Sequence, residues 1–94
     1  MSDLPNIRQL RGIDAMRALV EGRLPQPSIS ETLGFRMVAA EEGFVAFEGE
    51  PSKRVLNPMG VVHGGWLLTL VDSAGGCAAH STVEAGVGFA TIET

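Results

Sequence analysis

The stretch that decides the fold is Asn57-Pro58-Met59-Gly60-Val61-Val62-His63-Gly64-Gly65-Trp66-Leu67-Leu68-Thr69-Leu70-Val71-Asp72. Its first residues form a turn, because Pro58 disfavours helical geometry at Asn57 and Gly60 permits a sharp bend. From Trp66 to about Val83 the chain has no proline and few charges, which predicts a buried helix of roughly 18 residues and ~27 Å. Glycines at the start of this helix leave backbone N–H groups open to an anion. The stretch therefore predicts a helix N-terminus that holds an oxyanion.

Length and composition exclude several classes of protein. The 94 residues make one small domain, and a hydrophobic content of 45% excludes general disorder. A net charge of −4 argues against nucleic acid or an anionic membrane as the main partner. One cysteine cannot form an internal disulfide, and we expect neither a signal peptide nor a membrane span. We therefore expect a cytoplasmic protein.

The N-terminal part of the chain predicts a packing helix followed by a linker. Apolar residues recur there at intervals of three and four, which gives one stripe made of Leu4, Ile7, Leu10, Ile13, Met16, Leu19 and Val20. Gly12 can divide this stretch and Gly22 can end it, whereas the two prolines in residues 24–28 predict a linker that is not helical. We expect a helical segment with its linker at residues 1–27 and the main domain at residues 28–94.

Residues 34–51 have the alternation of a β-hairpin. The sequence alternates between two sets of residues in each run: first Phe35, Met37 and Ala39 with Arg36, Val38 and Ala40, then Phe44, Ala46 and Glu48 with Val45, Phe47 and Gly49. Glu41-Glu42-Gly43 lies between the two runs and predicts the turn. The segment from Val87 to Thr94 predicts a third strand.

The motif Asn57-x-x-Gly60-x-x-His63-Gly64-Gly65, followed by Leu70-x-Asp72, resembles that of hotdog-fold acyl-CoA thioesterases of the PaaI-like (phenylacetic acid degradation) branch. Residues 33–35, 72–74 and 86–91 agree as well, so the resemblance covers about residues 12–94. It implies an α+β hotdog fold, in which an antiparallel sheet wraps around one long central helix, and assembly into homodimers or homotetramers. The family's last strands have no counterpart here, and we expect a domain truncated at its C-terminus.

The resemblance also implies a reaction, the hydrolysis of an aryl- or medium-chain acyl-CoA to free acid and CoA without metal or cofactor. Such chemistry needs an oxyanion site and a group that attacks or activates water. Gly65 N–H, with Gly64, can polarise the thioester carbonyl, and Asp72 is the general base or the nucleophile. By resemblance, the supporting residues are Asn57, which places the water or the carbonyl, His63, which shapes the loop or contacts the thioester, and Thr91, which orients water.

Helix geometry separates two of these residues. Asp72 follows Gly65 by seven positions, so both lie on nearly the same helix face but ~10 Å apart along the axis. A base acts within about 3 Å of the proton that it takes, or through one water. One helix can therefore hardly supply both groups to one carbonyl, and an antiparallel second copy can. This argues for a two-fold dimer with shared sites.

Less specific interpretations compete with these roles. Asp72 can be a surface carboxylate, although its apolar neighbours predict burial, and Met59 and Trp66 can line an acyl pocket or pack the core. Cys77 is better explained as a small buried residue than as a nucleophile. Lys53 and Arg54 form a basic pair that is more often a solvated loop than a phosphate site. The alternative function is a non-catalytic hotdog module that binds acyl-CoA or a protein partner.

Overall fold

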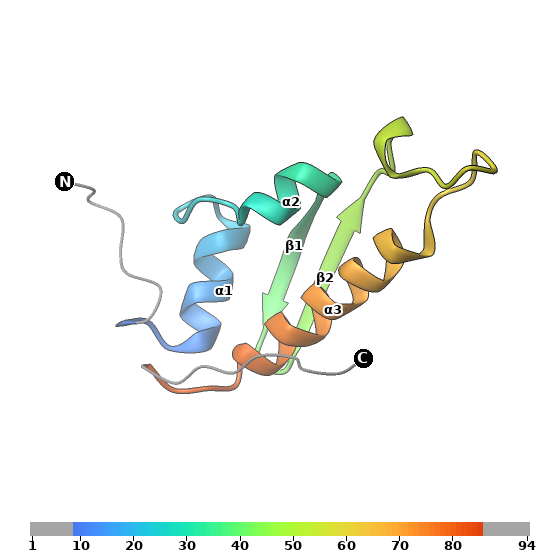
Figure 1. Ribbon diagram of the computed structural model, residues 1–94. Coiled ribbons are helices and arrows are strands. Elements are labelled where there is room, and N and C mark those ends of the chain that lie inside the picture. Colours follow the sequence, from blue (N-terminus) through green and yellow to red (C-terminus); the bar gives the residue numbers. More distant parts are fainter. Residues whose placement is uncertain (1–8, 86–94) are drawn as a thin grey trace.

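The computed structural model describes residues 9–85, and these residues form an α+β fold (Figure 1). The elements in chain order are α1 (Gly12–Val20), α2 (Ser28–Leu33), β1 (Phe35–Glu41), β2 (Phe44–Gly49), a 3-10 helix (Lys53–Val55) and α3 (Gly64–His80). The predicted α+β class is confirmed. The expected strand from Val87 to Thr94, with Thr91, lies outside the described residues, as do Leu4 and Ile7.

The predicted hairpin is confirmed. Strands β1 and β2 pair antiparallel, from Phe35 opposite Gly49 to Glu41 opposite Phe44, with a register irregularity between Met37 and Ala39. The two-residue turn carries Gly43 at a φ of 79°, where a side chain would be strained.

Helix α1 packs beside β1 (Figure 1) and forms most of the core. Of the expected apolar stripe, Ile13, Met16 and Leu19 are buried, and Leu10 and Val20 are partly buried. The core cluster consists of Ala15, Met16, Ala18, Leu19, Leu24 and Met37. Gly22, just past the end of α1, has a φ of 77°, which agrees with its expected place as a helix stop.

Helix α2 was not expected, because residues 24–28 were interpreted as a non-helical linker. The helix begins at Ser28, directly after Pro27, and ends at Gly34 with a φ of 73°. Six residues are too few for a helical periodicity to show in the sequence. The left-handed Gly34 is the one signal that a helix ends before β1.

Helix α3 is attached to the hairpin at both of its ends. Near its start, Trp66 donates from Nε1 to the Leu33 carbonyl at 2.7 Å and sets its ring edge-on to that of Phe35. Just beyond its end, the buried Ser81 hydroxyl accepts from the Gly43 N–H at 2.8 Å and donates to the Ala78 carbonyl at 2.6 Å. These contacts tie α3 to the α2–β1 junction and to the hairpin turn.

Most of α3 is less buried than its sequence predicts. Of its residues only Trp66 is buried, and the exposed fractions of Leu67, Leu68 and Val71 are 53%, 61% and 67%. The expected burial on all sides is therefore wrong for the described residues, because a two-stranded sheet covers only one side of a helix. Within residues 9–85, none of the helices has the length and hydropathy that a membrane span requires.

A close approach between α1 and α3 generates the first prediction. The Gly12 N–H donates to the Val83 carbonyl at 2.9 Å, and a Cβ at Gly12 would lie 1.6 Å from the His80 carbonyl oxygen. We expect Gly12→Ala to lower the free energy of unfolding by about 2–3 kcal/mol, a usual scale for overpacking, measured by chemical denaturation.

Gly75→Ala is the matched control, because a Cβ at Gly75 meets no atom within 4 Å. Alanine there should stabilise α3 by up to about 1 kcal/mol through helix propensity. Equal stabilities of the two variants would contradict the packing of α1 against the end of α3.

Candidate active site

The loop before α3, residues 56–63, projects from the body of the molecule (Figure 1). Backbone hydrogen bonds join its two ends. Leu56 and Val62 form an antiparallel bridge, and the His63 N–H donates to the Val55 carbonyl at 2.8 Å. Gly60 turns the loop with a φ of 77°. These bonds determine where the chain enters α3.

Asn57 holds the interior of this loop. Its Oδ1 accepts hydrogen bonds from the Met59 N–H at 2.9 Å and from the Val61 N–H at 3.1 Å. The side-chain oxygen is therefore committed to the backbone, and the amide NH₂ is the part of Asn57 that remains for a substrate. This bonding restricts the role implied for Asn57 to donation, either to a carbonyl oxygen or to water.

His63 caps α3 with its own side chain. Its Nδ1 accepts from the Gly65 N–H at 2.8 Å, and a Cβ on Gly65 would lie only 2.9 Å from that nitrogen. Residue 65 is thus a glycine partly because the imidazole ring occupies the space beside it. Gly64 is exposed, and its N–H has no hydrogen-bond partner within residues 9–85. Of the two predicted oxyanion donors, Gly64 is open and Gly65 is occupied by His63.

A cavity of about 270 Å³ adjoins this helix start. Its wall combines apolar side chains with a few polar groups: Leu33, Arg54, Val55, Leu56, His63, Gly65, Trp66 and Thr69. The structure therefore brings together Gly65, His63 and Trp66 of the predicted site. The sequence interpretation missed Thr69, and it considered Arg54 only in a basic pair that is more often a solvated loop than a phosphate site. The place of Arg54 beside the start of α3 depends on the tertiary bond between the His63 N–H and the Val55 carbonyl, which has no clear sequence signal.

Four other residues predicted for the site do not line this cavity, namely Asn57, Met59, Gly64 and Asp72. Asp72 is exposed, so its expected burial is wrong for the described chain, because the side of α3 that bears it has no sheet over it. Met59 is 83% exposed at the loop tip and does not line the cavity.

The remaining candidate groups add no second centre. Burial raises the pKa of the Cys77 thiol, which keeps it protonated and weakly nucleophilic, as expected for a packing residue. No group of three or more histidine, cysteine or acidic side chains within residues 9–85 is placed to hold a metal ion.

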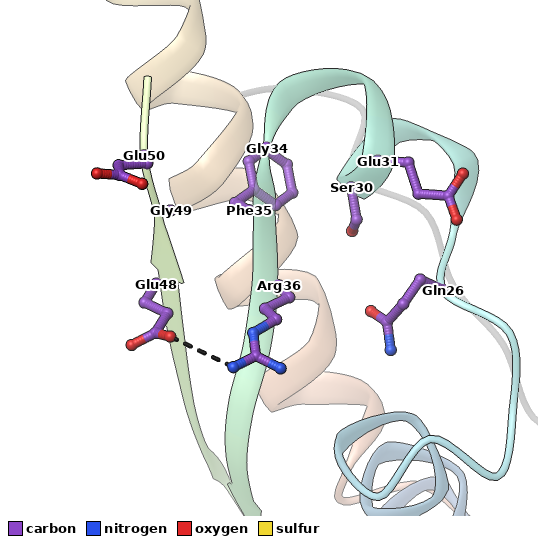
Figure 2. Close-up of a pocket in the computed structure, with 9 residues that line it drawn as sticks. All are labelled: Gln26, Ser30, Glu31, Gly34, Phe35, Arg36, Glu48, Gly49 and Glu50. Carbon is purple, nitrogen blue, oxygen red and sulfur yellow. Dashed lines mark ion pairs between the residues drawn. The ribbon is translucent and has the colours of Figure 1, made fainter. Parts of the chain in front are cut away.

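A larger hollow, of about 520 Å³, lies between α2 and the ends of the strands (Figure 2). Gln26 and Glu31 flank it on one side and Glu48 and Glu50 on the other, and Arg36 pairs with Glu48 at 3.6 Å. Its three carboxylates outnumber its one guanidinium, so it would repel the phosphates of an acyl-CoA. The cavity at the start of α3 is therefore the better candidate.

Comparison with known families supports this choice. The model of a family described as the thioesterase superfamily matches residues 59–94, a span that contains His63, Gly65 and Asp72. No curated protein and no solved structure matches the chain significantly. The described residues form an α+β fold in which α3 lies across an antiparallel hairpin, and the match fits a hotdog fold. It also supports a general thioester-hydrolase type of function.

The cap on Gly65 generates the second prediction. His63→Ala removes the acceptor of the Gly65 N–H, so this amide should exchange its hydrogen faster, and α3 should lose about 1 kcal/mol of stability, the usual size of a cap. Hydrogen exchange followed by NMR measures the first effect. His63→Asn supplies another capping oxygen and should retain most of the protection. Unchanged exchange at Gly65 in His63→Ala would show that the cap does not form in solution.

Proposed function

We propose that the protein is an acyl-CoA thioesterase of the PaaI-like branch, which hydrolyses an aryl- or medium-chain acyl thioester. The observation that carries this proposal is the pair of N–H groups of Gly64 and Gly65 at the start of α3, beside a cavity whose wall is largely apolar. A helix N-terminus stabilises the negative charge that develops on a thioester oxygen during attack.

In this mechanism the thioester carbonyl replaces the His63 ring at Gly65. The oxygen accepts from the Gly65 N–H, and the open Gly64 N–H gives a second donor. The Asn57 NH₂ supports the carbonyl or the attacking water. Because the Asn57 Oδ1 already holds the loop, the Asn57 NH₂ has a defined position before substrate arrives, whereas the Gly65 N–H becomes available only when the His63 ring moves away.

We propose that Asp72 acts on the carbonyl held by a second copy of the chain. Within α3, Gly65 and Asp72 lie ~10 Å apart along the helix axis, too far for one carbonyl. The exposure of Asp72 supports this arrangement, because its carboxylate is open to a partner. The assembly is then a homodimer, or a homotetramer built from such dimers. Thr91, as a residue that orients water, completes the proposed set.

The third prediction tests the role of Asp72. Asp72→Asn keeps the shape of the side chain and removes the base or nucleophile, so turnover should fall by about two orders of magnitude or more. The measurement is thiol release across a panel of acyl-CoA thioesters. Asp14→Asn, a change of the same kind in α1, is the control and should leave turnover unchanged. Turnover of Asp72→Asn near that of the unaltered protein would remove this residue from the mechanism.

The fourth prediction tests the shared site. A heterodimer of an Asp72→Asn chain and an Asn57→Ala chain contains one site in which both groups are intact. Its activity should therefore recover to about half that of the unaltered dimer, because a two-fold dimer has two equivalent sites. Verified heterodimers without any recovery would contradict a site built from two copies.

One observation favours a second candidate, a non-catalytic hotdog module that binds acyl-CoA or a protein partner. The Gly65 N–H already donates to His63 Nδ1, so it is not available to a thioester oxygen, as expected of a site that binds its ligand without hydrolysing it. The thiol-release assay separates the thioesterase from the binding module, because a binding module retains acyl-CoA affinity and releases no thiol.

We also propose that the protein is cytoplasmic, and that an N-terminal segment of residues 1–27 precedes the main domain of residues 28–94.

A further inference from the structure

The cavity at the start of α3 is positively charged in a chain that is negatively charged overall. Arg54 contributes a permanent positive charge to its wall, and no aspartate or glutamate lines it. The whole chain has a net charge of −4. Within residues 9–85 the Arg54 guanidinium has no carboxylate partner, in contrast to Arg23 with Glu21 and Arg36 with Glu48.

The backbone holds Arg54 close to the start of α3. The Arg54 N–H donates to the Ser52 Oγ at 3.2 Å, which caps the 3-10 helix Lys53–Val55. The next residue, Val55, accepts from the His63 N–H at 2.8 Å. Arg54 is therefore the direct neighbour of Val55, the residue that bonds to the histidine that caps α3. Its neighbour Lys53 does not line the cavity.

We propose that Arg54 binds an anionic oxygen group of the ligand, either a carboxylate at the end of its acyl group or a phosphate of coenzyme A. A guanidinium presents paired N–H donors that match the two oxygens of either group. The inference rests on the proposed function for the thioester itself, and it adds a charge preference to that site.

The size of the cavity limits what it receives. Its volume of about 270 Å³ lies just below the range of small-molecule pockets, ~300–1,000 Å³. It therefore accommodates one short charged segment of the ligand and not a whole acyl-CoA. Its apolar wall, with Leu33, Val55 and Leu56, suits the few carbons that precede such a charge.

Binding, measured without turnover, tests this inference. Trp66 is the only tryptophan of the chain and lines the cavity, so its fluorescence reports occupancy. The probes are coenzyme A, which carries phosphates, and the succinyl and butyryl thioesters of N-acetylcysteamine, which carry none. Titrations in an Asp72→Asn background preserve the thioesters. We expect Arg54→Gln to raise the Kd of at least one anionic probe about tenfold or more, the usual scale for a hydrogen bond to a charged group.

The probes separate the two sources of the anion. Weaker binding of coenzyme A assigns Arg54 to a phosphate, and weaker binding of the succinyl but not the butyryl compound assigns it to an acyl carboxylate. Lys53→Gln removes the neighbouring charge and should leave the affinity for coenzyme A and for both thioesters unchanged. Unchanged affinity for all three probes in Arg54→Gln, or an equal loss in Lys53→Gln, would overturn the inference. If the unaltered protein shows no thioesterase turnover but Arg54→Gln still weakens binding of an anionic probe, the proposed function is refuted and the role of Arg54 stands.

Discussion

The two attachments of α3 are the constraint on which the rest of the structure depends. Trp66 bonds the first turn of α3 to the end of α2, and Ser81 bonds the residue after its last turn to the hairpin turn. A helix held at both ends cannot slide along the sheet, so the position of its first N–H groups is determined. The same attachments leave Leu68 and Val71 exposed between them.

In the proposed mechanism, the hydrogen bond between His63 and Gly65 stabilises this helix start until substrate binds. A side-chain cap contributes about 1 kcal/mol, whereas one donor of an oxyanion hole contributes about 3–4 kcal/mol in a transition state. In the proposed mechanism a bound thioester oxygen therefore replaces the imidazole ring, and the oxyanion that develops on it gains the full strength of the donor. Asn57 holds the loop while His63 moves, because its own bonds run to Met59 and Val61 and not to the ring.

The sequence predicted those parts of the fold whose signals are local. The hairpin follows from alternation around Gly43, and α3 follows from a long run without proline. Helix α2 was missed because six residues carry no periodicity, and the exposure of Asp72 was missed because burial depends on what packs over a helix. For the site, spacing predicted the glycine donors but not the cap on Gly65, since that bond depends on the rotamer of His63. Arg54 lines the cavity because the neighbouring Val55 carbonyl accepts from the His63 N–H, a tertiary contact that no motif records.

The proposed mechanism requires a thioester oxygen to take the place of the His63 ring at the start of α3. A crystal structure with an acyl-CoA analogue in which a methylene replaces the sulfur tests this directly, because the resulting ketone binds without being cleaved. We expect the ketone oxygen about 3 Å from the Gly65 nitrogen, the distance of an oxyanion-hole donor, with the imidazole turned away. A bound analogue whose carbonyl lies elsewhere, with His63 Nδ1 still accepting from Gly65, would contradict it.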